Sequence, residues 1–100
     1  MTTDPSFRMT VEDVFSIRDR GTVVTGKIET GTLKVGDEVV IRGRNGKKTT
    51  TVTVIEAFRK VLDQANQGDA VGILLKDISR EDVQKGDEIL SSGSDFSWKP

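Results

Sequence analysis

The chain of 100 residues contains neither cysteine nor histidine. Without cysteine there is no disulfide framework, no thiolate nucleophile and no cysteine-bound zinc. Without histidine, the commonest general base and the commonest metal ligand of proteins are both missing. No pair of acidic residues stands out by its spacing either. The sequence therefore predicts a protein that is not an enzyme and that carries no metal or other cofactor.

Long hydrophobic runs are also absent. The N-terminal residues lack the apolar stretch of a signal peptide, and no segment has the length that a bilayer span needs. We therefore expect a cytoplasmic protein with no membrane partner. Hydrophobic residues make up 34% of the chain, which is enough for one core and one domain. With 15 basic and 16 acidic side chains the net charge is −1, so only a local patch would attract a polyanion.

Short segments rich in β-branched residues recur along the chain, separated by turn residues. The segments are residues 8–18, 22–29, 39–41, 49–58, 70–75 and 87–90. Residues 49–58 are long for one strand, so we expect a β-bulge near residues 55–57. The apolar run 70–75 is typical of a central buried strand. Six strands and almost no helix predict an all-β fold, namely a small closed antiparallel β barrel.

Two of these strands carry features of their own. Residues 8–18 alternate as a single strand, which places four side chains on one face: Val11, Asp13, Phe15 and Ile17. Gly26 interrupts the β-branched run 22–29, and a glycine inside a strand indicates a bulge or a tight barrel bend.

The turns have clear signals. Asn45-Gly46 is typical of a type I′ hairpin turn. A Gly-Asp pair precedes three of the strands, at residues 36–37, 68–69 and 86–87. Glycine supplies the positive φ there, and the aspartate carboxylate accepts from nearby backbone donors. Residues 79–82 have the spacing of a capping box and predict one helical turn. Residues 59–68 are expected to form a polar connection.

The glycines at the front of the chain raise the question of a phosphate-binding loop. Residues 21–27 have four residues between two glycines and then Lys27, as a Walker loop does. Position 28 is isoleucine, however, so the magnesium-binding hydroxyl is missing, and strand residues rather than a helix follow. We therefore interpret these glycines as bends and turns.

The motifs EDVFSI, RGTVVTG, E-x-FRK and VG-x-LL follow one another between Phe7 and Leu90. In this order and spacing the chain resembles the second domain of elongation factor Tu, a β barrel of the translational GTPase family. The resemblance implies a barrel of the translation-factor domain 2 type. It also shows what is missing, since that family hydrolyses GTP with a separate domain whose motifs do not occur here.

In the family this barrel forms one wall of the pocket for the aminoacyl end of transfer RNA. By similarity, the residues that line or border that pocket are Glu12, Asp13, Phe15, Thr25, Glu56, Phe58 and Arg59. Their chemistry fits the role. Phe15 and Phe58 offer faces for stacking, Glu56 can accept from a ribose hydroxyl, and Arg59 with Lys60 can neutralise a phosphate.

One position departs from the family pattern. Ala70 stands where the family usually has asparagine, whose amide would bind the backbone of the esterified amino acid. A homologue of this kind can keep the fold and lose the ligand.

The same sequence features also allow interpretations that involve no bound ligand. Phe15 and Phe58 are equally compatible with a place in the core. The basic cluster around the hairpin tip, Arg42, Arg44, Lys47 and Lys48, is either an RNA contact or an ordinary solvated surface. We expect residues 1–6 to form a flexible arm, residues 7–91 the barrel and residues 92–100 a polar tail, in which Phe96 and Trp98 either dock or stay loose.

Two functions compete. The first is a non-catalytic module that binds the acceptor end of aminoacyl transfer RNA or another translation component. The second is a protein-interaction or assembly module that has lost transfer RNA binding and uses the surface that faces the GTPase domain in the family. A fragment of a larger GTP-binding translation factor would have the same sequence features.

Overall fold

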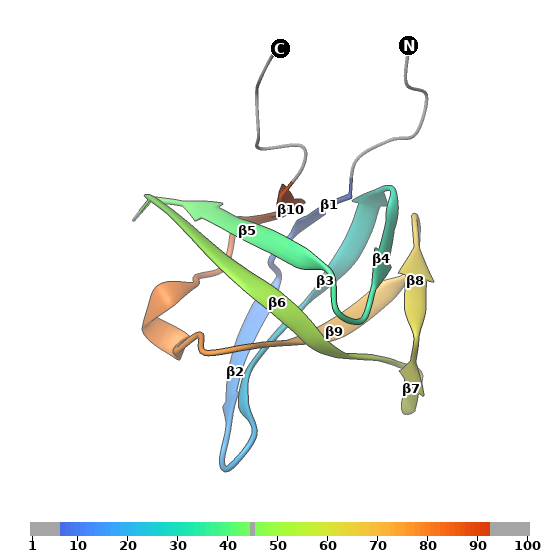
Figure 1. The fold of residues 1–100 in the computed structure, drawn as a ribbon, viewed down its shortest axis with the longest axis horizontal. Coiled ribbons are helices and arrows are strands. Elements are labelled where there is room, and N and C mark those ends of the chain that lie inside the picture. The colour runs from blue at the N-terminus through green and yellow to red at the C-terminus, as the bar shows by residue number, and fades with distance from the viewer. Residues whose placement is uncertain (1–6, 45, 93–100) are drawn as a thin grey trace, which may run out of the picture.

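The computed structural model describes residues 7–44 and 46–92, and these form a closed antiparallel barrel (Figure 1). Six strands make the ring, in the spatial order β1 (Arg8–Thr10), β10 (Glu88–Ser91), β5 (Glu38–Gly43), β6 (Gly46–Ala57), β9 (Ala70–Leu75) and β3 (Gly21–Thr30). Pairing of β1 with β3 closes the ring. The prediction of an all-β barrel of about six strands is confirmed.

Four further strands extend the ring. β2 (Asp13–Ile17) pairs with β3 to form a hairpin that projects from the barrel (Figure 1), and β7 (Lys60–Leu62) pairs with β6. A short ribbon joins β4 (Thr32–Lys34) to β8 (Gln64–Asn66). The expected polar connection at residues 59–68 was therefore wrong, because its residues form β7, β8 and the turns beside them.

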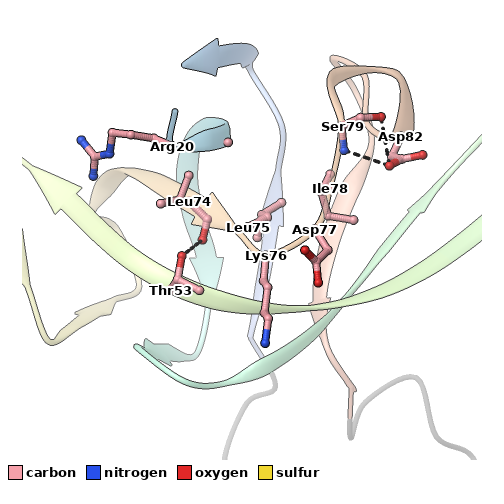
Figure 2. Close-up of a pocket in the computed structure, with 10 residues that line it drawn as sticks. Arg20, Thr53, Leu74, Leu75, Lys76, Asp77, Ile78, Ser79 and Asp82 are labelled. Carbon is pink, nitrogen blue, oxygen red and sulfur yellow. Dashed lines mark hydrogen bonds between the residues drawn. The ribbon is translucent and has the colours of Figure 1, made fainter. Parts of the chain in front are cut away.

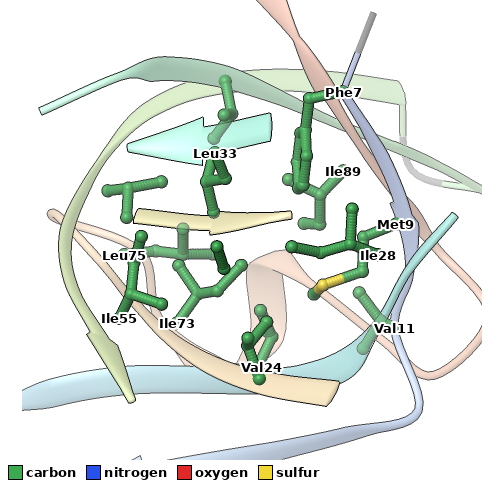
Figure 3. Close-up of a cluster of buried hydrophobic side chains, with 14 of the residues drawn as sticks. Phe7, Met9, Val11, Val24, Ile28, Leu33, Ile55, Ile73, Leu75 and Ile89 are labelled. Carbon is green, nitrogen blue, oxygen red and sulfur yellow. The ribbon is translucent and has the colours of Figure 1, made fainter. Parts of the chain in front are cut away.

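The core fills the inside of the ring with branched aliphatic side chains (Figure 3). Alternation along the strands puts every second side chain inside, as on β9, where Val71, Ile73 and Leu75 are buried. β9 lies between β3 and β6, so its central position is confirmed, but only one of its faces is buried. Its other face, with Ala70 and Gly72, belongs to the surface.

The three Gly-Asp turns are built alike, and the predicted role of their aspartates is confirmed. The glycines Gly36, Gly68 and Gly86 have φ of 96°, 94° and 93°. In the first turn the carboxylate of Asp37 accepts from the N–H of Lys34 at 2.9 Å, and the N–H of Asp37 donates back to the carbonyl of Lys34 at 3.0 Å. Asp69 and Asp87 repeat both bonds with Asn66 and Gln84.

Each of these turns also holds one buried residue of another segment. Gly36 donates to the carbonyl of Val52 at 2.8 Å, and the carbonyl of Asp37 accepts from the N–H of Val52 at 3.0 Å. The second turn holds Ile28 in the same way. The third turn holds Val11, with bonds of 2.9 and 2.8 Å.

The bond pair at Val11 explains a correction. Residues 8–18 are not one strand, because the backbone of Val11 pairs with residues 86–87 and the N–H of Glu12 donates to the carbonyl of Thr25 at 2.7 Å. The alternation is reset at this point. Val11 is buried, whereas Asp13, Phe15 and Ile17 are exposed, so the four do not share a face.

The predicted β-bulge and the predicted hairpin turn both differ from what the structure shows. The register of β6 against β9 shifts between Val52 and Val54 rather than near residues 55–57. At the β5–β6 hairpin Gly43 pairs with Gly46, so Gly46 begins β6 and is not a central residue of the turn. Asn45 lies outside the described residues, as do the expected arm of residues 1–6 and, in the expected tail, residues 93–100 with Phe96 and Trp98.

Ion pairs tie the end of the barrel together. The predicted helical turn is a 3₁₀ turn, η1 (Arg80–Asp82), in which the Asp82 carboxylate accepts from the N–H of Ser79 at 2.9 Å. Lys48 on β6 donates to Asp82 at 2.8 Å, and this bond, followed by the one from Ser79, lowers the pKa of Asp82 to about 2. Glu88 bridges Arg42 and Arg8, which lower its pKa.

Within the described ranges, no helix has the length and hydrophobicity that a bilayer crossing demands.

We expect acid to weaken the fold through Asp82. Its folded pKa lies below the unfolded value of about 4, so the ionised carboxylate stabilises the fold above that pH and loses this effect as the pH falls to about 2. The urea midpoint should therefore fall between about pH 5 and pH 2, and it should fall less in Asp82→Asn. Identical profiles for the wild type and Asp82→Asn would contradict the assignment.

The strand glycines Gly26 and Gly72 should respond oppositely to a methyl group. A Cβ at Gly26 would overlap the carbonyl oxygen of Thr10 and lie 3.1 Å from Met9 Cγ, so Gly26 marks close contact with β1. A Cβ at Gly72 would lie 3.5 Å from Val23, an ordinary contact. Urea denaturation should show a loss of about 1–3 kcal/mol for Gly26→Ala and a change within about 0.5 kcal/mol for Gly72→Ala. Equal losses would refute the distinction.

Candidate functional site

Three of the predicted site residues lie in one row across the outside of the sheet. Strand register places Asp13 opposite Thr25, Thr25 opposite Gly72, and Gly72 opposite Glu56. Val61 on β7 completes the row opposite Glu56. Paired residues of adjacent strands point to the same face, so a carboxylate, a hydroxyl and a second carboxylate line up around the gap that Gly72 leaves.

A second, apolar row runs beside the first. Phe15 lies opposite Val23, Val23 opposite Leu74, and Leu74 opposite Val54. Phe15 is 50% exposed, and the other three side chains are half-buried. The interpretation of Phe15 as a core residue was therefore wrong. Together the two rows form an open surface, here called the outer face, which is polar along one row and apolar along the next.

The β6–β7 hairpin adds an aromatic and a basic side chain at the rim of this face. Ala57 pairs with Lys60, which leaves a two-residue loop of Phe58 and Arg59 with φ of 54° and 64°. A type I′ turn requires positive φ at both positions and favours Asn and Gly. Phe58 is a bulky residue in this strained conformation, and its side chain is 85% exposed. It is not a core residue.

Two further positions border the first row. Glu12 is exposed and precedes β2, where its N–H donates to the carbonyl of Thr25. Ala70 lies on β9 two residues from Gly72 and opposite Lys27. Both residues 70 and 72 therefore project from the outer face, and a side chain at position 70 would reach the gap at Gly72.

The charged side chains Arg20 and Glu56 form only a weak ion pair on the outer face. Arg20 lies 3.9 Å from Glu56, and both side chains are about half exposed. An exposed pair at this distance is weak and a ligand readily displaces it. Among the described residues no group of three or more acidic side chains is placed to hold a metal ion.

The basic cluster of the β5–β6 hairpin is largely engaged within the barrel. Arg42 donates to Glu88 at 2.5 Å and Lys48 to Asp82 at 2.8 Å. These bonds reduce the positive charge that the cluster presents to a polyanion. The hairpin tip is thus a weaker candidate for RNA contact than the outer face.

A cavity of about 500 Å³ adjoins the apolar row (Figure 2). Arg20, Leu74 and Thr53 line one side of it, and the loop after β9, including Ile78, lines the other. None of the seven predicted site residues lines this cavity. The candidate site is therefore the open outer face and not a deep pocket.

Several residues of the face were missed by sequence reasoning. Gly72 and Leu74 lay in a run expected to be a buried strand, Val23 lay in a predicted strand without an assigned face, and Val61 fell in the expected connection. Their position on the face follows from strand register, which one sequence does not give. The sequence of β9, AVGILL, is apolar throughout, so it contains no alternation that would have distinguished the outward-facing Gly72 and Leu74 from the buried residues.

The strained loop should be replaceable by a more stable one. Exchanging Phe58 and Arg59 together for Asn and Gly relieves two unfavourable φ angles, so the free energy of unfolding should rise by about 1–2 kcal/mol in urea denaturation. The control Phe58→Leu removes the ring but keeps the strain, and should change stability by less than about 0.5 kcal/mol. An equal gain in the free energy of unfolding for Phe58→Leu would mean that the exposed ring, and not the positive φ of the loop, destabilises the wild-type protein.

The family model described as Elongation factor Tu domain 2 matches residues 21–90. The match covers Thr25, Glu56, Phe58 and Arg59 of the outer face and begins after β2. It agrees with the closed six-stranded barrel of the structure.

Proposed function

The chain belongs to the elongation factor Tu domain 2 family, and from this premise we propose that residues 7–91 act as a non-catalytic module that binds the aminoacylated acceptor end of transfer RNA. The proposal rests on one observation. Asp13, Thr25 and Glu56 share a register row around Gly72, with exposed aromatic rings at its side and rim.

Each group on the face has a partner in an acceptor end. Unstacked bases bind to aromatic rings, which Phe15 and Phe58 present. Glu56 accepts from a ribose hydroxyl, which distinguishes RNA from DNA. Arg59 and Lys60 lie beside Phe58 in the hairpin and provide positive charge for a terminal phosphate. Gly72 leaves the backbone open to close approach of the ligand.

Ala70 limits how well the amino acid itself is recognised. The family asparagine would offer an amide at this point of β9, and alanine offers no hydrogen bond. We therefore propose that this module recognises the terminal nucleotides more strongly than the esterified amino acid. Discrimination between charged and uncharged transfer RNA should be small.

The family supports a proposal for the process in which this binding takes part. Its members act in translation, so we propose a translation component in the cytoplasm as the partner. These 100 residues contain one barrel and no GTPase domain. Any link to GTP hydrolysis would therefore run through a GTPase domain outside these residues.

A second function is favoured by the amount of exposed apolar surface. Phe15, Ile17, Phe58 and Val61 are all exposed, and the latter two lie on one hairpin. Such surfaces also mark protein interfaces. In this alternative the face binds a protein partner and shows no preference for RNA.

Titration of labelled protein with transfer RNA at low salt separates these functions. We expect binding in the high micromolar range or tighter, with NMR shift changes at Glu56, Phe58 and Arg59. Phe58→Ser should weaken binding about tenfold, and Gly72→Ala should weaken it without loss of stability. Arg44→Ser, which changes the hairpin tip instead, is the matched control and should bind like wild type.

A gain of function tests the role of position 70. Ala70→Asn should increase the preference for aminoacylated over deacylated transfer RNA by about fivefold, since one hydrogen bond is added. No shift changes on the face at high micromolar RNA would reject the proposal.

A further inference from the structure

β2 is an edge strand with an open side. It pairs with β3, and its other edge pairs with no strand within residues 7–44 and 46–92. Figure 1 shows the β2–β3 hairpin projecting beyond the ring. Natural edge strands are usually protected by lysine, proline or a bulge, because unpaired backbone groups recruit other strands. The central residues Val14, Phe15 and Ser16 carry none of these protections.

The backbone groups on the open edge can be assigned. The carbonyl of Ile17 accepts from the N–H of Arg20 at 3.0 Å, so it points into the hairpin. Backbone groups of successive residues in a strand point to opposite sides, so those of Phe15 also point toward β3. The N–H and carbonyl groups of Val14 and Ser16 therefore face the open edge.

We propose that two copies of this chain pair antiparallel through β2, with Val14 of each copy opposite Ser16 of the other. This is the register that uses both open residues of each copy, and it forms four backbone hydrogen bonds. It places the two Phe15 rings directly opposite each other at the twofold axis, where the strands approach most closely. The proposal does not depend on the RNA-binding function.

Charge complementarity supports the same register. Glu12 of one copy lies opposite Arg18 of the other, twice in the dimer. Both side chains are exposed, and among the described residues neither forms an ion pair. A shift by one residue in each copy would place Asp13 opposite Asp19 in one direction, although Glu12 would then face Arg20, and Phe15 opposite Asp13 in the other direction.

A small groove adjoins the start of β2. A groove of about 260 Å³ runs between Asp13 and Val14 on one side and the η1 region, with Arg80 and Lys85, on the other. In the proposed register the end of the other hairpin, which carries Arg18, Asp19 and Arg20, approaches this groove. A contact of five residues per strand is small, so the dimer should be weak, with a dissociation constant of about 10 μM to 1 mM.

Cysteine cross-linking tests the geometry in the full chain, which has no cysteine of its own. Phe15→Cys places two thiols opposite each other at the axis and should form a disulfide-linked dimer under mild oxidation. Phe58→Cys is the matched control, since it replaces a more exposed phenylalanine away from the edge. The rate for Phe15→Cys should be at least about tenfold higher. Equal rates would mean random collision and would overturn the proposal.

Charge reversal tests the register without altering Phe15. Sedimentation equilibrium up to about 1 mM should show that Glu12→Arg or Arg18→Glu raises the dissociation constant about tenfold, and that the double variant restores dimerisation. Glu12 lies just before β2 and Arg18 in the turn just after it, at opposite ends of the strand, so rescue can only arise between copies. A wild-type protein that stays monomeric at 1 mM, or a double variant without rescue, would refute the pairing.

A backbone variant completes the test. Ser16→Pro removes an N–H from the open edge and leaves the β3 side of the strand intact, so the fold should survive and the dimer should be lost. Ser16→Thr is its control and should dimerise like wild type. A Ser16→Pro protein that folds and still dimerises would contradict the assignment of the edge.

Discussion

The barrel depends on one interaction that occurs three times: a Gly-Asp turn that holds a single buried residue between two backbone hydrogen bonds. The residues held, Val11, Ile28 and Val52, are at most 2% exposed, so water does not compete for these bonds. The turns lead into β5, β9 and β10, and the residues that they hold lie on or beside β6, β3 and β1. All six strands of the ring are thus joined by the same device.

The third of these turns also bears on which side chains of β2 belong to the outer face. Because both backbone groups of Val11 pair with residues 86–87, the chain cannot continue as one regular strand. The break at Glu12 resets the alternation, which turns Asp13, Phe15 and Ile17 outward although Val11 points inward. Asp13 therefore joins the row of Thr25 and Glu56, and Phe15 joins the apolar row, because of a constraint that arises where the barrel closes.

The sequence predicted the parts of the fold that local chemistry determines. Glycine and aspartate specify the three turns, and β-branched runs specify the ring strands, so both were found. The break at Val11 and the shift between Val52 and Val54 arise from bonds between distant segments, which a local pattern does not contain. For the proposed site, the resemblance predicts residues such as Glu56 and Phe58, but Gly72 joins the row only through register, and the strained conformation of Phe58 has no local signal.

Stability alone does not account for the two exposed phenylalanines. Asn-Gly would form the β6–β7 turn with less strain, and a charged residue would protect the edge of β2, yet Phe58 and Phe15 occupy these positions. In the proposed dimer the twofold axis is perpendicular to the sheet, so the outer faces of both copies lie on the same side of one continuous sheet. Phe15 then belongs both to the axis and to each row. If both proposals hold, pairing of copies and ligand binding would be coupled through this residue, and an occupied face would change the affinity between copies by the same factor as pairing changes the affinity for the ligand.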